Sequence, residues 1–110
     1  MTQSGHNFIK NMSKEFETAK TILLSNGYKI IDTEYSRESF GSWHITVDTQ
    51  PKRRVVWDGK DYQLVVGEET KVIFNGLNVW KDIWVSERIE IDKLGSLMSE
   101  VLQSKFNWPK

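Results

Sequence analysis

The strongest constraint on the fold is a change in the spacing of apolar residues, from a helical period to a strand period, at Asn26-Gly27. Before this point the apolar side chains recur as they do on one stripe of an α-helix. That stripe comprises Phe8, Met12, Phe16, Ala19 and Leu23. The spacing predicts a helix over about residues 7–25. Asn7 is suited to cap its start, and Asn26-Gly27 supplies the left-handed residue that commonly ends a helix.

Strands are expected next, because apolar and polar residues then alternate. Residues 28–36 and 40–49 predict two antiparallel strands joined by a polar turn at residues 37–39. Pro51 ends the second strand, since proline cannot donate a hydrogen bond to the sheet.

A β-hairpin follows, in the segment RRVVWDGKDYQLVV. A tight turn at Asp58-Gly59 pairs Val55 with Tyr62, and a turn one residue later pairs Trp57 with Tyr62. Either turn leaves the same apolar side chains on one face. These are Val55, Trp57, Tyr62, Leu64 and Val66.

The segment KVIFNGLNVWKDIWVSE has two interpretations. Trp80 and Trp84 are a helical step apart, but the richness in β-branched and aromatic residues favours a second hairpin turning at residues 75–76. In such a hairpin the odd-numbered residues Val79, Ile83 and Val85 are expected to point to the same face of the sheet.

A second helix closes the chain, with Asp92 as its cap and Pro109 as its stop. Its apolar stripe comprises Leu94, Leu97, Met98, Val101 and Leu102. The order predicts an α+β domain: an N-terminal helix, an antiparallel sheet of about five or six strands, and a C-terminal helix packed on the sheet.

Composition narrows the class of protein. The 110 residues predict a single domain, residues 1–110, that folds without metals or disulfides. The absence of cysteine excludes thiol chemistry and fits a reducing compartment, so a cytoplasmic location is expected. No apolar run has the length of a signal peptide or membrane span. Because 15 basic and 15 acidic residues cancel, no global field favours binding to nucleic acid or lipid.

No set of residues converges on catalysis. His6 and His44 are too few and too far apart for a metal cage, so neither a metal nor another cofactor is expected. His44 alternates with Trp43 and should face solvent. Asp58 and Asp61 flank one turn and are candidates for paired carboxylates, but turn formation is the favoured explanation for them. The sequence therefore predicts a protein that is not an enzyme and has no small-molecule substrate.

A basic patch offers an alternative function. Lys52, Arg53 and Arg54 lie near Trp57 and Tyr62, and sheets that bind single-stranded nucleic acid combine basic and aromatic side chains. Trp57 and Tyr62, however, share a face with apolar residues of a core, so stacking on bases is disfavoured. Nucleic-acid binding through this patch is kept as the second hypothesis.

Trp80 and Trp84 have the parity opposite to Val79, Ile83 and Val85. If the latter group is buried, the two tryptophans project outward among charged residues, as anchors at protein interfaces do. If the parity is reversed, both tryptophans belong to the core. Both alternatives place the two tryptophans on one face.

The motifs SFGSWHITVD, RRVVWDGKDYQLVV and VWKDIWVSE, within about residues 40–86, resemble those of small cytoplasmic immunity proteins of polymorphic-toxin and contact-dependent growth inhibition systems. Such proteins have no enzymatic activity and bind the toxin domain of a cognate effector, often a nuclease. The resemblance implies a toxin domain as the partner. It implies a docking site made of Trp80 and Trp84 as anchors and Asp82, Glu87, Glu90 and Glu68 as charge partners. The neutral net charge departs from the acidic composition common among nuclease inhibitors.

Overall fold

The computed structural model describes residues 14–102. Along the chain, five strands lie between two helices. One short 3-10 turn lies between the first two strands, and another lies between the last strand and the second helix. The elements are α2 (Lys14–Ser25), β1 (Ile30–Ser36), η1 (Arg37–Ser39), β2 (Ser42–Val47), β3 (Arg53–Asp58), β4 (Gln63–Phe74), β5 (Leu77–Val85), η2 (Ile91–Lys93) and α3 (Leu94–Glu100). The predicted α+β class and element order are confirmed.

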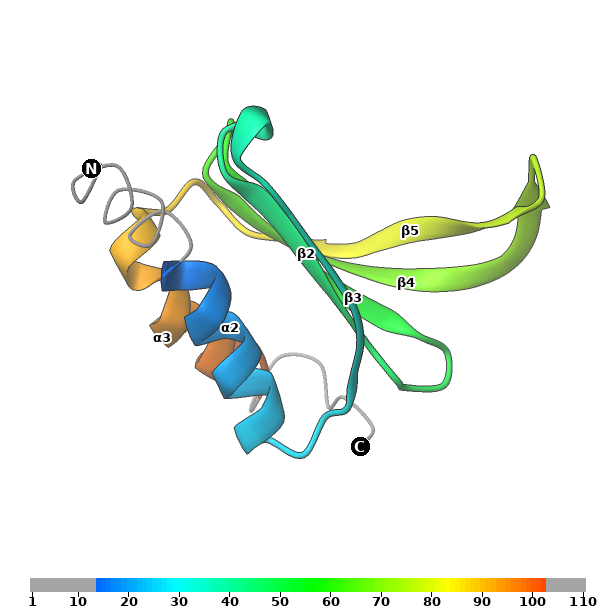
Figure 1. The fold of residues 1–110 in the computed structure, drawn as a ribbon, viewed down its shortest axis with the longest axis horizontal. Helices are drawn as coiled ribbons and strands as arrows, with labels where there is room; N and C mark the ends of the chain where they lie inside the picture. Colours follow the sequence, from blue (N-terminus) through cyan, green and yellow to red (C-terminus); the bar gives the residue numbers. More distant parts are fainter. Residues whose placement is uncertain (1–13, 103–110) are drawn as a thin grey trace, which may run out of the picture.

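The strands form one antiparallel sheet in the order β1-β2-β3-β4-β5, so each strand pairs with its neighbour in the sequence. Both helices pack on the same face of this sheet (Figure 1). The inward residues of β2, β3 and β4 meet the apolar stripes of the helices and exclude water. The largest fully buried side chains of this core are Leu23, Ile45, Val47, Val55, Trp57, Leu64, Val66, Leu94 and Met98. No helix within residues 14–102 combines the length and apolarity that crossing a membrane requires.

The first helix ends where the sequence predicts. Gly27 adopts a φ of 86°, and the Tyr28 and Gly27 amides donate to the carbonyls of Leu23 and Leu24. These bonds satisfy carbonyls that the helix leaves free at its end. The predicted start at residue 7, including the Asn7 cap, lies outside the described residues.

The second helix begins differently from the prediction. Asp92 lies within η2, and α3 begins after Lys93 with no side-chain cap. The prediction that Asp92 caps the helix is therefore wrong, although the predicted stripe packs into the core. Pro109 lies outside the described residues.

The hairpin of β3 and β4 has neither predicted register. Asp58 pairs with Gln63 and Trp57 with Leu64, so the loop has four residues. Asp58 Oδ1 accepts hydrogen bonds from the Lys60 and Asp61 amides, which favours this longer loop. The predicted inward face is confirmed for the strand residues, whereas Tyr62 lies in the loop with a φ of 56°.

β4 and β5 are longer than the other strands, and their hairpin projects beyond the rest of the sheet, to the right in Figure 1. It turns at Asn75-Gly76 as predicted, and both turn residues have positive φ angles. We call its distal part, residues 70–79, the arm. The sheet register shifts between Glu69 and Ile73, where β4 carries more residues than β5. Such an irregularity bends a hairpin.

Gly59 allows two loops to pack closely at the end of the sheet opposite to the arm. A Cβ atom at Gly59 would lie 2.0 Å from the Phe40 carbonyl oxygen, which is too close for any side chain. The Gly59 amide also donates to Ser42 Oγ at 2.9 Å. The turn between β1 and β2 and the loop between β3 and β4 therefore touch through their backbones.

We predict that Gly59→Ala lowers the free energy of unfolding by about 1–3 kcal/mol, because the two loops must separate. Gly95→Ala is the control: its Cβ would make ordinary contacts, the nearest at 3.4 Å from Thr18 Cγ2, within a helix that favours alanine. Urea denaturation measures both changes. Equal stability of the two variants would contradict this packing.

Candidate protein-binding surface

The helices leave one face of the sheet uncovered, and we call it the open face (Figure 1). One row of cross-strand partners on this face comprises Asp32, Thr46, Arg54, Gly67 and Asp82. Opposed residues in an antiparallel sheet point to the same side. The register therefore brings one arginine between two aspartates that are 50 positions apart in the sequence.

Arg54 is the centre of this row. Its guanidinium lies over the Trp80 ring, 4.3 Å from the centroid, where the ring attracts a cation. Burial lowers the pKa of Arg54, and the carboxylates of Asp82 and Asp32 oppose that effect. Arginine keeps its charge even so. A half-buried tryptophan and arginine thus lie beside exposed carboxylates on the open face.

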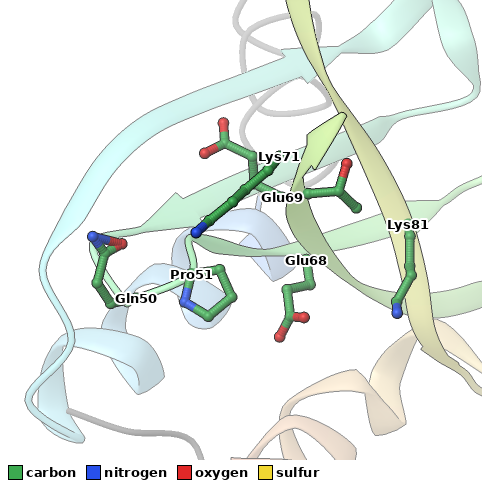
Figure 2. Close-up of a pocket in the computed structure, with 7 residues that line it drawn as sticks. Gln50, Pro51, Glu68, Glu69, Lys71 and Lys81 are labelled. Atoms are coloured by element: carbon green, nitrogen blue, oxygen red, sulfur yellow. The ribbon is translucent and has the colours of Figure 1, made fainter. Parts of the chain in front are cut away.

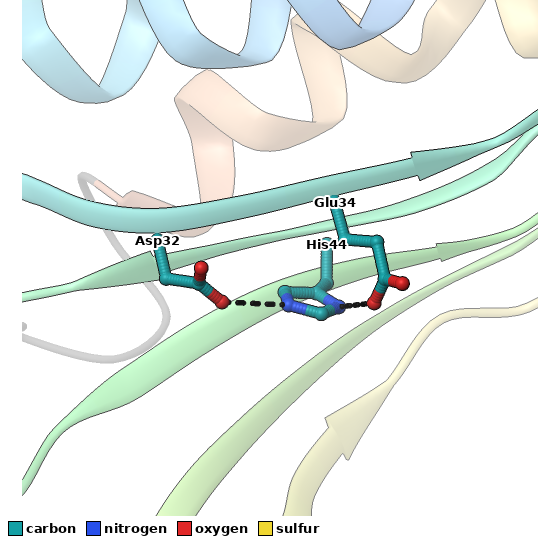
Figure 3. A network of polar contacts seen from close by, with 3 residues as sticks. All are labelled: Asp32, Glu34 and His44. Atoms are coloured by element: carbon teal, nitrogen blue, oxygen red, sulfur yellow. Dashed lines mark hydrogen bonds and ion pairs between the residues drawn. The ribbon is translucent and has the colours of Figure 1, made fainter.

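His44 extends the polar surface toward β1. Its Nε2 atom lies 3.2 Å from Asp32 Oδ2, and its Nδ1 atom lies 3.7 Å from Glu34 Oε1. Figure 3 shows these side chains on the side of the strands away from the helices. Both ring nitrogens face carboxylates, so neither is directed at a hydroxyl that it could activate as a base.

Trp80 and Trp84 lie on opposite faces of the sheet. Trp84 pairs with Val66, whereas Asp82 pairs with Gly67, so Ile83 is an extra residue in β5. This bulge reverses the alternation. Trp84 packs against the core beneath the helices. The expectation that the two tryptophans share a face is therefore wrong.

The expectation that Val79, Ile83 and Val85 share one face of β5 is also only partly correct. Val79 and Val85 are exposed to 37% and 46%, and only Ile83 packs against the core.

The basic patch is divided between the faces. Arg53 points to the helix side, where its Nη2 atom lies 3.1 Å from Glu68 Oε2 and its Nε atom donates to the same oxygen. Arg54 points to the open face, since neighbouring residues in a strand alternate. Lys52 is exposed in the preceding loop. The three basic residues therefore do not present one continuous surface.

Glu68 lines a recess of about 570 Å³ at the base of the arm (Figure 2). The recess is bounded by Gln50, Pro51, Glu68, Glu69, Thr70, Lys71 and Lys81. Its lining combines carboxylates with ammonium groups and contains no aromatic ring. It has the composition of an interface rim rather than of an apolar ligand pocket.

Glu87 and Glu90 are exposed in the connection between β5 and α3, away from the Arg54 row. Between them, Arg88 lies 4.7 Å from the Tyr62 ring centroid and the Ile89 amide donates to the Tyr62 carbonyl. The predicted acidic residues thus occupy three places: Asp82 on the open face, Glu68 on the helix side, and this connection.

The arm carries exposed apolar residues that sequence reasoning missed. Val72, Ile73, Phe74 and Leu77 are each more than 60% exposed. The sequence does contain a sign of this apolar surface, because in KVIFNGLNV apolar residues stand on both sides of the Asn75-Gly76 turn. This hairpin extends past its neighbours, and no other element within residues 14–102 covers it.

No cluster of histidine and carboxylate side chains suited to a metal ion occurs among residues 14–102. Asp58 is engaged by loop amides, as the turn explanation expected. No protein-family model, curated protein or solved structure matches the chain.

We predict that Glu68→Gln lowers the free energy of unfolding by about 1–3 kcal/mol, because it removes the negative charge that the half-buried Arg53 guanidinium contacts. Glu69→Gln makes the same chemical change at the next residue, for which no ion pair to another described residue is observed, and should cost less than about 0.5 kcal/mol. Thermal and urea denaturation compare the two. A larger loss for Glu69→Gln would contradict the assigned pairing.

Proposed function

We propose that this chain is a non-catalytic protein-binding domain that neutralises a toxin by covering part of its surface. The observation that carries the proposal is the cluster of Trp80, Arg54 and Asp82 on the open face. Tryptophan and arginine dominate binding energy at protein interfaces, especially where they are packed and shielded from water. Trp80 and Asp82 are also two of the residues that the resemblance to immunity proteins implies.

The charge of the open face favours a basic partner. Asp32, Glu34 and Asp82 oppose a single guanidinium there, so the face is negative although the chain is neutral. Local charge of this kind raises the rate of association and selects among partners. The neutral composition is therefore compatible with binding to a basic toxin domain such as a nuclease.

Three valines give this charged surface an apolar centre. Val56 pairs with Val65, which pairs with Val85, in the row next to Arg54. The first two are half-buried and Val85 is exposed to 46%. An apolar centre with a charged border is the usual anatomy of a protein interface.

The proposal predicts that a tagged chain, expressed with the product of the reading frame immediately upstream, retains that product at a one-to-one ratio after washing at high salt. Retention together with loss of the product's toxicity would support neutralisation. Absence of a retained protein, with salt-sensitive binding to single-stranded nucleic acid, would contradict it and favour the basic residues as the site.

A charge reversal tests the surface. Asp82→Lys should weaken binding of the upstream product about 10- to 100-fold, because it places a cation against a basic partner. Asp92→Lys, the same reversal at an exposed residue in η2, should change binding less than about threefold. Calorimetric titration measures both affinities, and circular dichroism confirms that both variants are folded. Equal losses would show that the open face is not the docking surface.

A further inference from the structure

The arm concentrates the exposed apolar surface of the described chain. The exposed fractions are 62% for Val72, 65% for Ile73, 69% for Phe74, 73% for Leu77 and 37% for Val79. No charged residue occurs from position 72 to position 80. A continuous apolar surface of this kind on a small domain marks an interaction site more often than chance exposure.

Exposed apolar side chains lie on both faces of the arm, but mainly on one. Phe74 and Leu77 are cross-strand partners and share one face, and alternation adds Val72 and Val79 to it. This face continues the side of the sheet that the helices cover, but the helices do not extend along the arm (Figure 1). Ile73 pairs with Asn78 and projects from the opposite face.

The arm is held in shape by its own polar contacts. Thr70 Oγ1 donates to the Val79 carbonyl at 2.7 Å, and Asn78 Nδ2 donates to the Thr70 carbonyl at 2.8 Å. Asn75 and Gly76 have φ angles of 54° and 80°, which suit the tight turn that best joins twisted strands. A preformed hairpin loses little conformational entropy when it binds.

We propose that the arm inserts into an apolar cleft of the partner protein; this inference rests on the proposed function and adds a second contact to the open face. A cleft covers both faces of a hairpin at once, which a flat surface cannot do. Charged residues return only at the base, where Glu69, Lys71 and Lys81 border the recess of Figure 2. An apolar tip with a charged base matches an inserted core with a polar rim.

A second copy of the chain fits the arm less well. Face-to-face contact between two arms would bury roughly 400 Å² on each copy, about half of what a stable complex buries on each partner. It would also leave Ile73 exposed on the outer side. The recess at the base of the arm is lined largely by charged groups, so it is not an apolar cleft that could receive the arm of another copy.

The test uses two phenylalanines with the same exposed fraction. Phe74, on the arm, and Phe40, beside η1, are both exposed to 69%. Phe74→Ser and Leu77→Ser should each weaken binding of the upstream product at least about 30-fold, as expected for a central anchor. Phe40→Ser should leave the affinity within about twofold. All three side chains lie outside the core, so the variants should fold, and circular dichroism checks this.

The outcomes separate the two proposals. If both arm variants bind as tightly as the wild-type chain while Asp82→Lys binds weakly, the insertion is wrong and the open face alone carries the function. If the wild-type chain retains no product, the proposed function fails, and the insertion fails with it. A stable dimer that sediments at low micromolar concentration and is lost in Phe74→Ser would overturn the insertion in favour of self-association.

Discussion

The structure depends on burial of one face of an antiparallel sheet beneath two helices. Burial of apolar area is the main favourable term in folding, and here it involves the inward residues of β2, β3 and β4. The described parts of the helices cover the sheet but do not extend along residues 70–79 (Figure 1). The arm is the part of the long hairpin that lies beyond this coverage.

The same arrangement decides which polar residues can meet a partner. Because side chains alternate along β3, Arg53 lies on the helix side in an ion pair with Glu68, whereas Arg54 lies on the open face over the Trp80 ring. Pairing across five strands then gathers Asp32, Arg54 and Asp82 in one row. The open face therefore combines an arginine that lies over a tryptophan ring with an acidic border, the composition on which the proposed function rests.

Much of the fold could be predicted from local patterns, because the helix stop at Asn26-Gly27 and the alternation in β2 and β3 depend on nearby residues. The four-residue loop before Gln63 could not, since several turns suit the same letters. The site was harder to predict. One extra residue at Ile83 placed Trp80 and Trp84 on opposite faces, and a bulge leaves no clear mark in composition. The exposure of the arm depends on where the helices pack on the sheet, which local periodicity does not report.

Hydrogen exchange of the free chain and of its complex with the upstream product tests the central claim most directly, namely that the surfaces left uncovered by the helices are those that bind. Binding should slow exchange of amides in residues 70–81 and leave α2 and α3 unchanged. Protection confined to α2 and α3, with the arm exchanging as in the free chain, would contradict the account and place the docking surface on the helices.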